Sequence, residues 1–158
     1  MSQPGRGWER HAEGLLGIAA SAILLSMTAL TFVDVVARYL FSRPLRGAFE
    51  VTELMLLVLI FAGLPLVSYA NEHALMDFID HILPASLQRG LVRTVELVCA
   101  ATMGLLAWLV WLKADRIWAY RDTTDVLRIA YGPFVYFMAV MVALAALIHL
   151  YRALVRPA

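Results

Sequence analysis

The sequence predicts an all-α integral membrane protein, with four transmembrane helices and a short interfacial amphipathic helix between the second and third of them. Hydrophobic residues make up 62% of the 158 residues, and charged residues only 16%. Four stretches are long and nearly free of charge, and a helix needs about 20 apolar residues to cross a bilayer. The segments between these stretches are too short to form a soluble core. We therefore expect a single membrane domain over residues 1–158.

The four spans are expected at about residues 14–37, 51–70, 91–112 and 129–151. The first contains twenty consecutive residues without an ionisable side chain, Gly14–Val33. That run is longer than the 7–15 apolar residues typical of a signal peptide, and no small-x-small cleavage pattern follows it. We therefore interpret it as a retained transmembrane helix.

Charged residues lie at the boundaries of the first two spans. Asp34 and Arg38 are four residues apart, so they share one helix face and can pair near the headgroups. Pro and Gly residues in the following connection, 42–47, halt the first helix. Glu50 and Glu53 then begin the second span, where the helix dipole favours carboxylates. This clustering of unlike charges predicts a group that organises one end of the first two helices.

The connection between the second and third spans has a helical pattern of its own. Apolar residues recur at helical spacing over 74–83, while Asp77 and two other polar residues fall largely on the other side. This pattern predicts a short helix lying in the membrane surface. The third helix then enters the bilayer past Arg93 and Glu96. Before the fourth helix, the residues 123–125 offer N-caps, and Pro133 falls near its first turn.

The residues themselves give little sign of chemistry. The four histidines allow a haem hypothesis, but only one lies clearly within a span: His11, His73, His81 and His149. We favour interfacial histidines over a haem site. No metal-ligand spacing, phosphate-binding loop or nucleophile motif is present, so neither an enzyme nor a cofactor is expected. The net charge of +1 includes no basic arm for nucleic acid. Because no charge falls at a span's midpoint, transport by this chain alone is disfavoured.

Several motifs together resemble one family. They are Asp34-Val-Val-Ala-Arg38-Tyr39, Pro44-Leu45-x-Gly47-x-x-Glu50, Gly63-Leu64-Pro65, His73 with Asp77, and Leu83-Pro84. Their order and spacing resemble the small membrane subunit of tripartite ATP-independent periplasmic (TRAP) transporters, the DctQ-like family, from the first span through the third. One departure precedes the last span, where Leu127–Pro133 replaces a Leu-x-Ile-Pro-like stretch.

The resemblance implies a four-helix accessory subunit, embedded in lipid, that braces a larger membrane subunit carrying the substrate and sodium sites. It implies a periplasmic binding protein that delivers an organic anion, often a carboxylate, and uptake driven by sodium. Both termini would be cytoplasmic at a bacterial inner membrane, an orientation that the distribution of basic residues does not itself decide. Candidate interface or structural residues are Asp34, Arg38, Tyr39, Glu50, Glu53, His73, Asp77, Arg93 and Glu96. A haem-binding redox anchor and a self-sufficient small transporter remain the alternatives.

Overall fold

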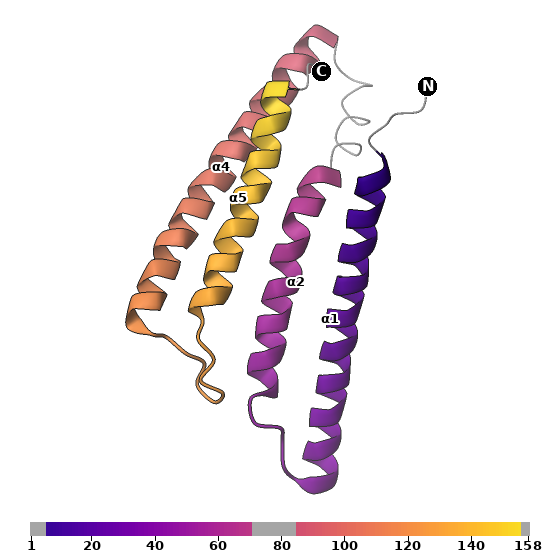
Figure 1. Ribbon diagram of the computed structural model, residues 1–158, viewed down its shortest axis with the longest axis vertical. Helices are drawn as coiled ribbons and strands as arrows, with labels where there is room; N and C mark the ends of the chain where they lie inside the picture. The colour runs from indigo at the N-terminus through magenta and orange to yellow at the C-terminus, as the bar shows by residue number, and fades with distance from the viewer. Residues whose placement is uncertain (1–5, 71–84, 156–158) are drawn as a thin grey trace. The chain divides into compact units, whose positions relative to one another are not determined.

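The chain forms four long helices in the computed structural model, which describes residues 6–70 and 85–155 (Figure 1). They are α1 (Arg6–Phe41), α2 (Ala48–Ala70), α4 (Ala85–Tyr120) and α5 (Gly132–Val155). Within the described ranges there is no strand, only one isolated antiparallel bridge between Thr123 and Ala130. The predicted all-α class is confirmed.

Each helix contains a segment long and apolar enough to cross a membrane. These segments are Gly17–Phe41, Ala48–Ser68, Gly90–Tyr120 and Gly132–Val155. The prediction of four transmembrane helices is therefore confirmed. The interfacial helix expected at 74–83 lies outside the described residues.

The helices extend beyond the apolar stretches from which they were predicted. The third predicted span, 91–112, is the centre of α4, which runs from Ala85 to Tyr120. Polar residues continue the helix at both ends because a backbone that is already helical gains one hydrogen bond for each added residue. The fourth helix begins at Gly132 and not near residue 129, so the residues 123–125 do not cap it. Pro133 does lie in its first turn, as expected.

The chain divides into two compact units, which are described separately. The first contains α1, α2 up to Ile60 and the loop Thr123–Ala130. In this unit α1 ends at Phe41, and the next residue, Ser42, has a φ of 53°, in the left-handed region where helices commonly stop. The connection then reaches Gly47, with φ of 81°. The amide of Val51 donates to the carbonyl of Gly47 over 3.1 Å as α2 begins.

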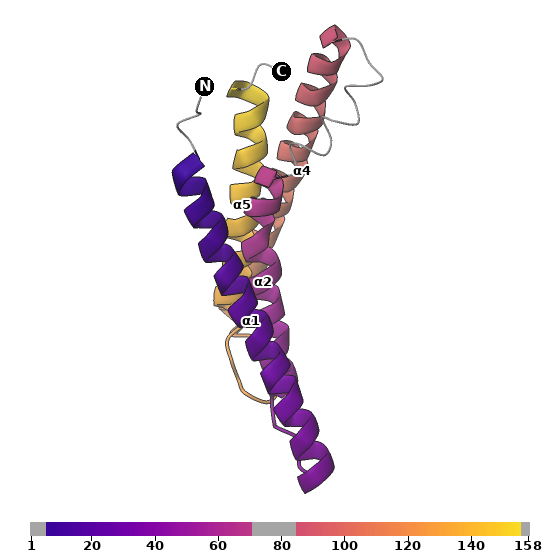
Figure 2. The same ribbon diagram turned by 90° about the vertical axis from the view of Figure 1, so that its right-hand side faces the viewer.

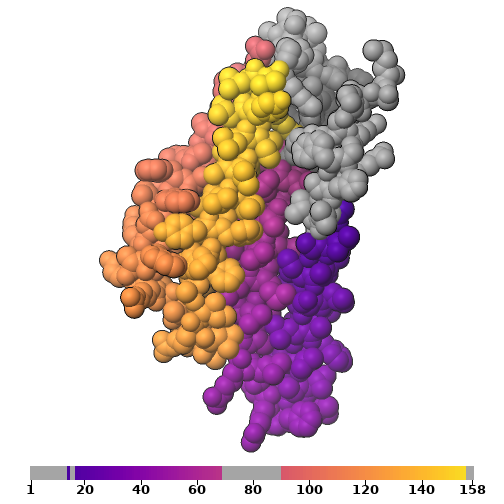
Figure 3. All heavy atoms as spheres, viewed as in Figure 1, coloured from indigo at the N-terminus to yellow at the C-terminus, as the bar shows by residue number. Residues whose placement is uncertain are grey.

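The second unit contains the rest of α2, together with α4 and α5. The helices α4 and α5 lie side by side over most of their length (Figures 1 and 2). In the space-filling view, side chains of α5 lie directly against those of α4 (Figure 3). Alanines fill this contact, including the fully buried Ala114 and Ala145. Small side chains let two helix backbones approach closely in a membrane, where the hydrophobic effect does not drive helices together.

An aromatic cluster packs near the end of α4. The ring of Tyr136 lies edge-on to Trp111, with 5.2 Å between ring centroids, and to Trp118 at 6.4 Å. The hydroxyl of Tyr136 donates to Asp115 over 2.6 Å. Aromatic residues with a polar tip are typical of the membrane interface. This cluster therefore indicates where α4 and α5 leave the hydrocarbon.

The helix α4 ends in a Schellman motif. The amide of Asp122 donates to the carbonyl of Ile117, and that of Arg121 to Trp118, each over 3.2 Å. Arg121 takes the left-handed position of this motif, with φ of 54°. Glycine is the usual residue there, so the end of α4 was not evident from the sequence. The turn directs the chain into the loop that precedes α5.

Candidate functional site

Asp34 links the end of α1 to the segment that joins α1 to α2. One carboxylate oxygen accepts from Arg38 Nη2 over 2.8 Å, which confirms that the two residues share a helix face. The other oxygen accepts from the backbone amide of Leu45 over 2.7 Å. The side chain of Asp34 is 14% exposed and that of Arg38 60% exposed. Asp34 therefore fixes the connection, while Arg38 leaves much of its guanidinium accessible.

Glu50 holds the loop that precedes α5, a role that the sequence did not suggest. Its two carboxylate oxygens accept from the backbone amides of Val126, over 2.7 Å, and Leu127, over 2.9 Å. Glu50 is buried, and these partners lie 76 and 77 residues away in the sequence. Glu50, Val126 and Leu127 all belong to the first unit. A carboxylate that accepts two amides at once fixes both the position and the orientation of the loop tip.

The loop itself is shaped so that these two amides are available. The amide of Thr124 donates to the carbonyl of Ile129 over 2.9 Å, and the Thr124 hydroxyl accepts from the Ile129 amide over 3.0 Å. Arg128 has a left-handed φ of 56° between them. Thr124 is 1% exposed, so it is a buried organising residue of the loop and not a helix N-cap.

Gly47 allows the same loop to pack closely. A Cβ atom on Gly47 would lie 2.7 and 2.8 Å from Cδ1 and Cδ2 of Leu127, closer than real Cβ contacts come. Its φ of 81° also belongs to the region where a side chain is strained. Within the first unit, Gly47 and Glu50 thus contact the same short segment of the loop. This explains why a glycine and a carboxylate occur three residues apart at the start of α2.

The second unit contains another charged cluster, near the end of α2. Arg152 is 8% exposed, and its Nη1 donates to the carbonyl of Ser68 over 2.6 Å. The same nitrogen lies 4.0 Å from Glu96 Oε1, and Glu96 Oε2 is 2.6 Å from Nδ1 of His149. The last carbonyls of a helix lack intrahelical partners, so Arg152 satisfies one of them in α2. Glu96 was a predicted structural candidate, but its partners on α5 were not predicted.

The remaining predicted residues do not join these clusters. Tyr39, Glu53 and Arg93 are exposed, and Glu53 does not share the contacts of Glu50. His73 and Asp77 lie outside the described residues. Within 6–70 and 85–155, no group of three side chains is arranged to hold a metal ion. Among the histidines, only the side chain of His149 is described, so the haem hypothesis stays untested.

A family model described as the DctQ component of tripartite ATP-independent periplasmic transporters matches residues 27–157. No curated protein and no solved structure matches the chain. The matched range covers most of the sequence, including Asp34, Glu50 and Arg152. The chain therefore belongs to the DctQ family, the small membrane component of TRAP transporters.

Proposed function

We propose that this protein is the accessory subunit of a sodium-driven TRAP transporter that depends on a binding protein and takes up an organic anion such as a carboxylate. In this proposal it braces a larger membrane subunit in a bacterial inner membrane, with both termini cytoplasmic, and has no enzymatic activity. The observation that carries the proposal is the family match over residues 27–157.

The distribution of charge supports an accessory role. The stretch Leu97–Leu112 in the middle of α4 contains no charged side chain. The charged groups that have partners, such as Asp34, Glu50 and Arg152, lie near helix ends. Secondary transporters bind substrate and ions near the bilayer midplane, where polar groups are needed. A larger subunit would supply such a site.

The first unit provides the structural basis for a contact with a partner. Asp34 and Glu50 use their carboxylates to fix two loop segments, so the neighbouring exposed residues are held in place. Phe49 is 82% exposed, and Arg43 and Arg46 are also exposed. Fixed aromatic and arginine side chains are enriched at protein interfaces. We infer that this surface contacts the large subunit or the docked binding protein.

Reconstitution tests the proposed function. The chain is tagged and expressed together with the products of adjacent reading frames, and co-purification of a large membrane protein is measured. Uptake into liposomes should then require both membrane proteins, the binding protein and a sodium gradient. Flux catalysed by this chain alone would overturn the accessory role. A Soret band in the purified protein would instead support the haem-binding redox anchor.

A double variant tests the roles of Arg38 and Glu50. Arg38→Gln with Glu50→Gln should impair assembly with the large subunit or uptake. The matched control is Arg116→Gln with Asp122→Asn, which removes one positive and one negative charge from exposed side chains outside this surface. Full uptake with intact assembly in the first variant would refute the proposed role of Arg38 and Glu50.

A further inference from the structure

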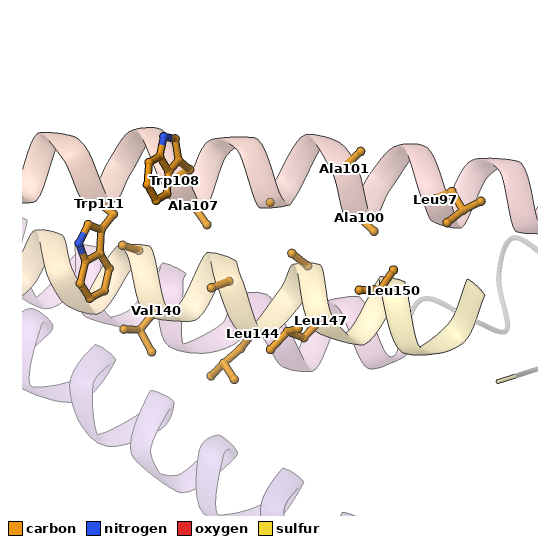
Figure 4. Close-up of a pocket in the computed structure, with 14 residues that line it drawn as sticks. Leu97, Ala100, Ala101, Ala107, Trp108, Trp111, Val140, Leu144, Leu147 and Leu150 are labelled. Atoms are coloured by element: carbon orange, nitrogen blue, oxygen red, sulfur yellow. The ribbon is translucent and has the colours of Figure 1, made fainter. Parts of the chain in front are cut away.

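The paired helices α4 and α5 form an open apolar groove with a volume of about 750 Å³. Leu97 and Leu150 lie at one end of it and Trp111 at the other (Figure 4). The lining is almost wholly apolar and includes several alanines on both helices. Gly104 also lines it, and a Cβ atom at Gly104 would meet no atom within 4 Å. The groove therefore exists because small residues replace the bulky side chains usual in a membrane helix.

The groove is longer than one lipid leaflet is deep. Leu97 and Trp111 are fourteen residues apart on α4, which corresponds to ~21 Å along a helix. One leaflet contributes ~15 Å of the hydrocarbon core. An acyl chain that entered at the Leu97 end would therefore stay within the groove through the whole of its leaflet.

A positive charge stands at the Leu97 end. Arg93 precedes Ala100 by seven residues and Gly104 by eleven, so all three fall within ~20° of one line along α4. The side chain of Arg93 is exposed, and it has no ion pair or hydrogen bond in the described part of the chain. Glu96 does not neutralise it, because its oxygens face His149 and Arg152.

We propose that this groove binds one anionic phospholipid, with an acyl chain lying between Leu97 and Trp111 and the phosphate group at Arg93. An apolar groove alone gives little selectivity in a membrane, because the lipid tail leaves other tails and not water. Arg93 supplies the selectivity, since a long basic side chain near a helix end reaches the headgroup layer. This inference does not depend on the transport function.

Native mass spectrometry of the purified protein tests whether the charge of Arg93 selects an anionic lipid. The full chain, with any membrane subunit that co-purifies, is placed in bilayers of equal parts phosphatidylglycerol and phosphatidylcholine. The wild type should retain phosphatidylglycerol preferentially, and Arg93→Gln should lower that preference about fivefold. Lys113→Gln removes one positive charge elsewhere on α4 and should leave the preference unchanged. Equal losses in the two variants would overturn the proposal.

A second pair of variants tests the groove. Gly104→Leu fills it and should abolish retention of bound lipid, whereas Thr102→Leu places the same leucine side chain at an exposed position outside the lining. Unchanged retention in Gly104→Leu would contradict the proposal. Loss of a co-purified subunit or of a dimer in Gly104→Leu, with lipid still bound, would also contradict it. In that case the groove would be a helix interface. In the wild-type protein, failure of uptake with lipid retained would count only against the transport function.

Discussion

Replacing Gly47 by alanine should destabilise the first unit more than any other single methyl group added to a described glycine. Two effects combine. Gly47 has φ of 81°, and holding an L-residue in the left-handed region costs about 1–2 kcal/mol. The new Cβ would also lie 2.7 and 2.8 Å from two carbons of Leu127, and overpacking of this kind costs about 1–3 kcal/mol. The expected loss is therefore about 2–5 kcal/mol.

The free energy of unfolding can be measured by titrating the purified protein from mild detergent into a denaturing detergent, with far-UV circular dichroism as the signal. Gly90→Ala is the control, because Gly90 is helical and a Cβ there meets no atom within 4 Å. Alanine should be neutral or stabilising there by up to about 1 kcal/mol.

A double-mutant cycle separates the two effects of Gly47→Ala. In the background Leu127→Ala the steric clash is gone, so the cost should fall to the backbone strain alone. The coupling between the two sites should be about 1–3 kcal/mol. A Gly47→Ala protein as stable as the wild type, or a cycle without coupling, would refute this account of the start of α2.

Three further predictions concern other contacts. Arg152→Gln should cost about 1.5–3 kcal/mol of unfolding free energy, because the charged hydrogen bond to the Ser68 carbonyl is lost. Arg152→Lys should recover part of this loss. Equal losses for the two variants in the detergent titration would argue against this bond. Arg38→Gln should cost only about 0.2–1 kcal/mol of unfolding free energy, because its ion pair with Asp34 is exposed. Asp34→Ala should cost more, since Asp34 also accepts a hydrogen bond from the Leu45 amide. The reverse order would contradict the assigned roles. Gly132→Ala should cost about 1–3 kcal/mol of unfolding free energy, because the new Cβ would crowd the ring of Trp118. An unchanged thermal unfolding temperature would contradict this and show that the ring can move.

The spans could be predicted from the sequence because crossing a membrane imposes a length and a composition that are visible in the residues themselves. The pairing of Asp34 with Arg38 could be predicted for a similar reason, since helical spacing alone brings them together. The family could be predicted from the order of short motifs. In each case the information is local, or is a series of local features.

The contacts between distant segments could not be predicted. Glu50 and Arg152 bond to backbone groups, and every residue offers such groups, so neither partner leaves a mark in the sequence. Thr124 was expected to cap the fourth helix because threonine is common at N-caps. Its hydroxyl instead accepts from Ile129 within the loop, and α5 begins only at Gly132. A hydroxyl near the start of a helix indicates a capping group, but it does not show which amide will donate a hydrogen bond to it.

The bonds of Glu50 and Arg152 also have a consequence for biosynthesis. The partners of α2 are separated from it by 76 to 84 residues and are translated after it. While the first two helices enter the bilayer, Glu50 and the carbonyl of Ser68 must be satisfied by water or lipid headgroups. A ribosome that stalls before α5 is complete would leave Ser68 without Arg152, so such a nascent chain should be recognisable to membrane proteases.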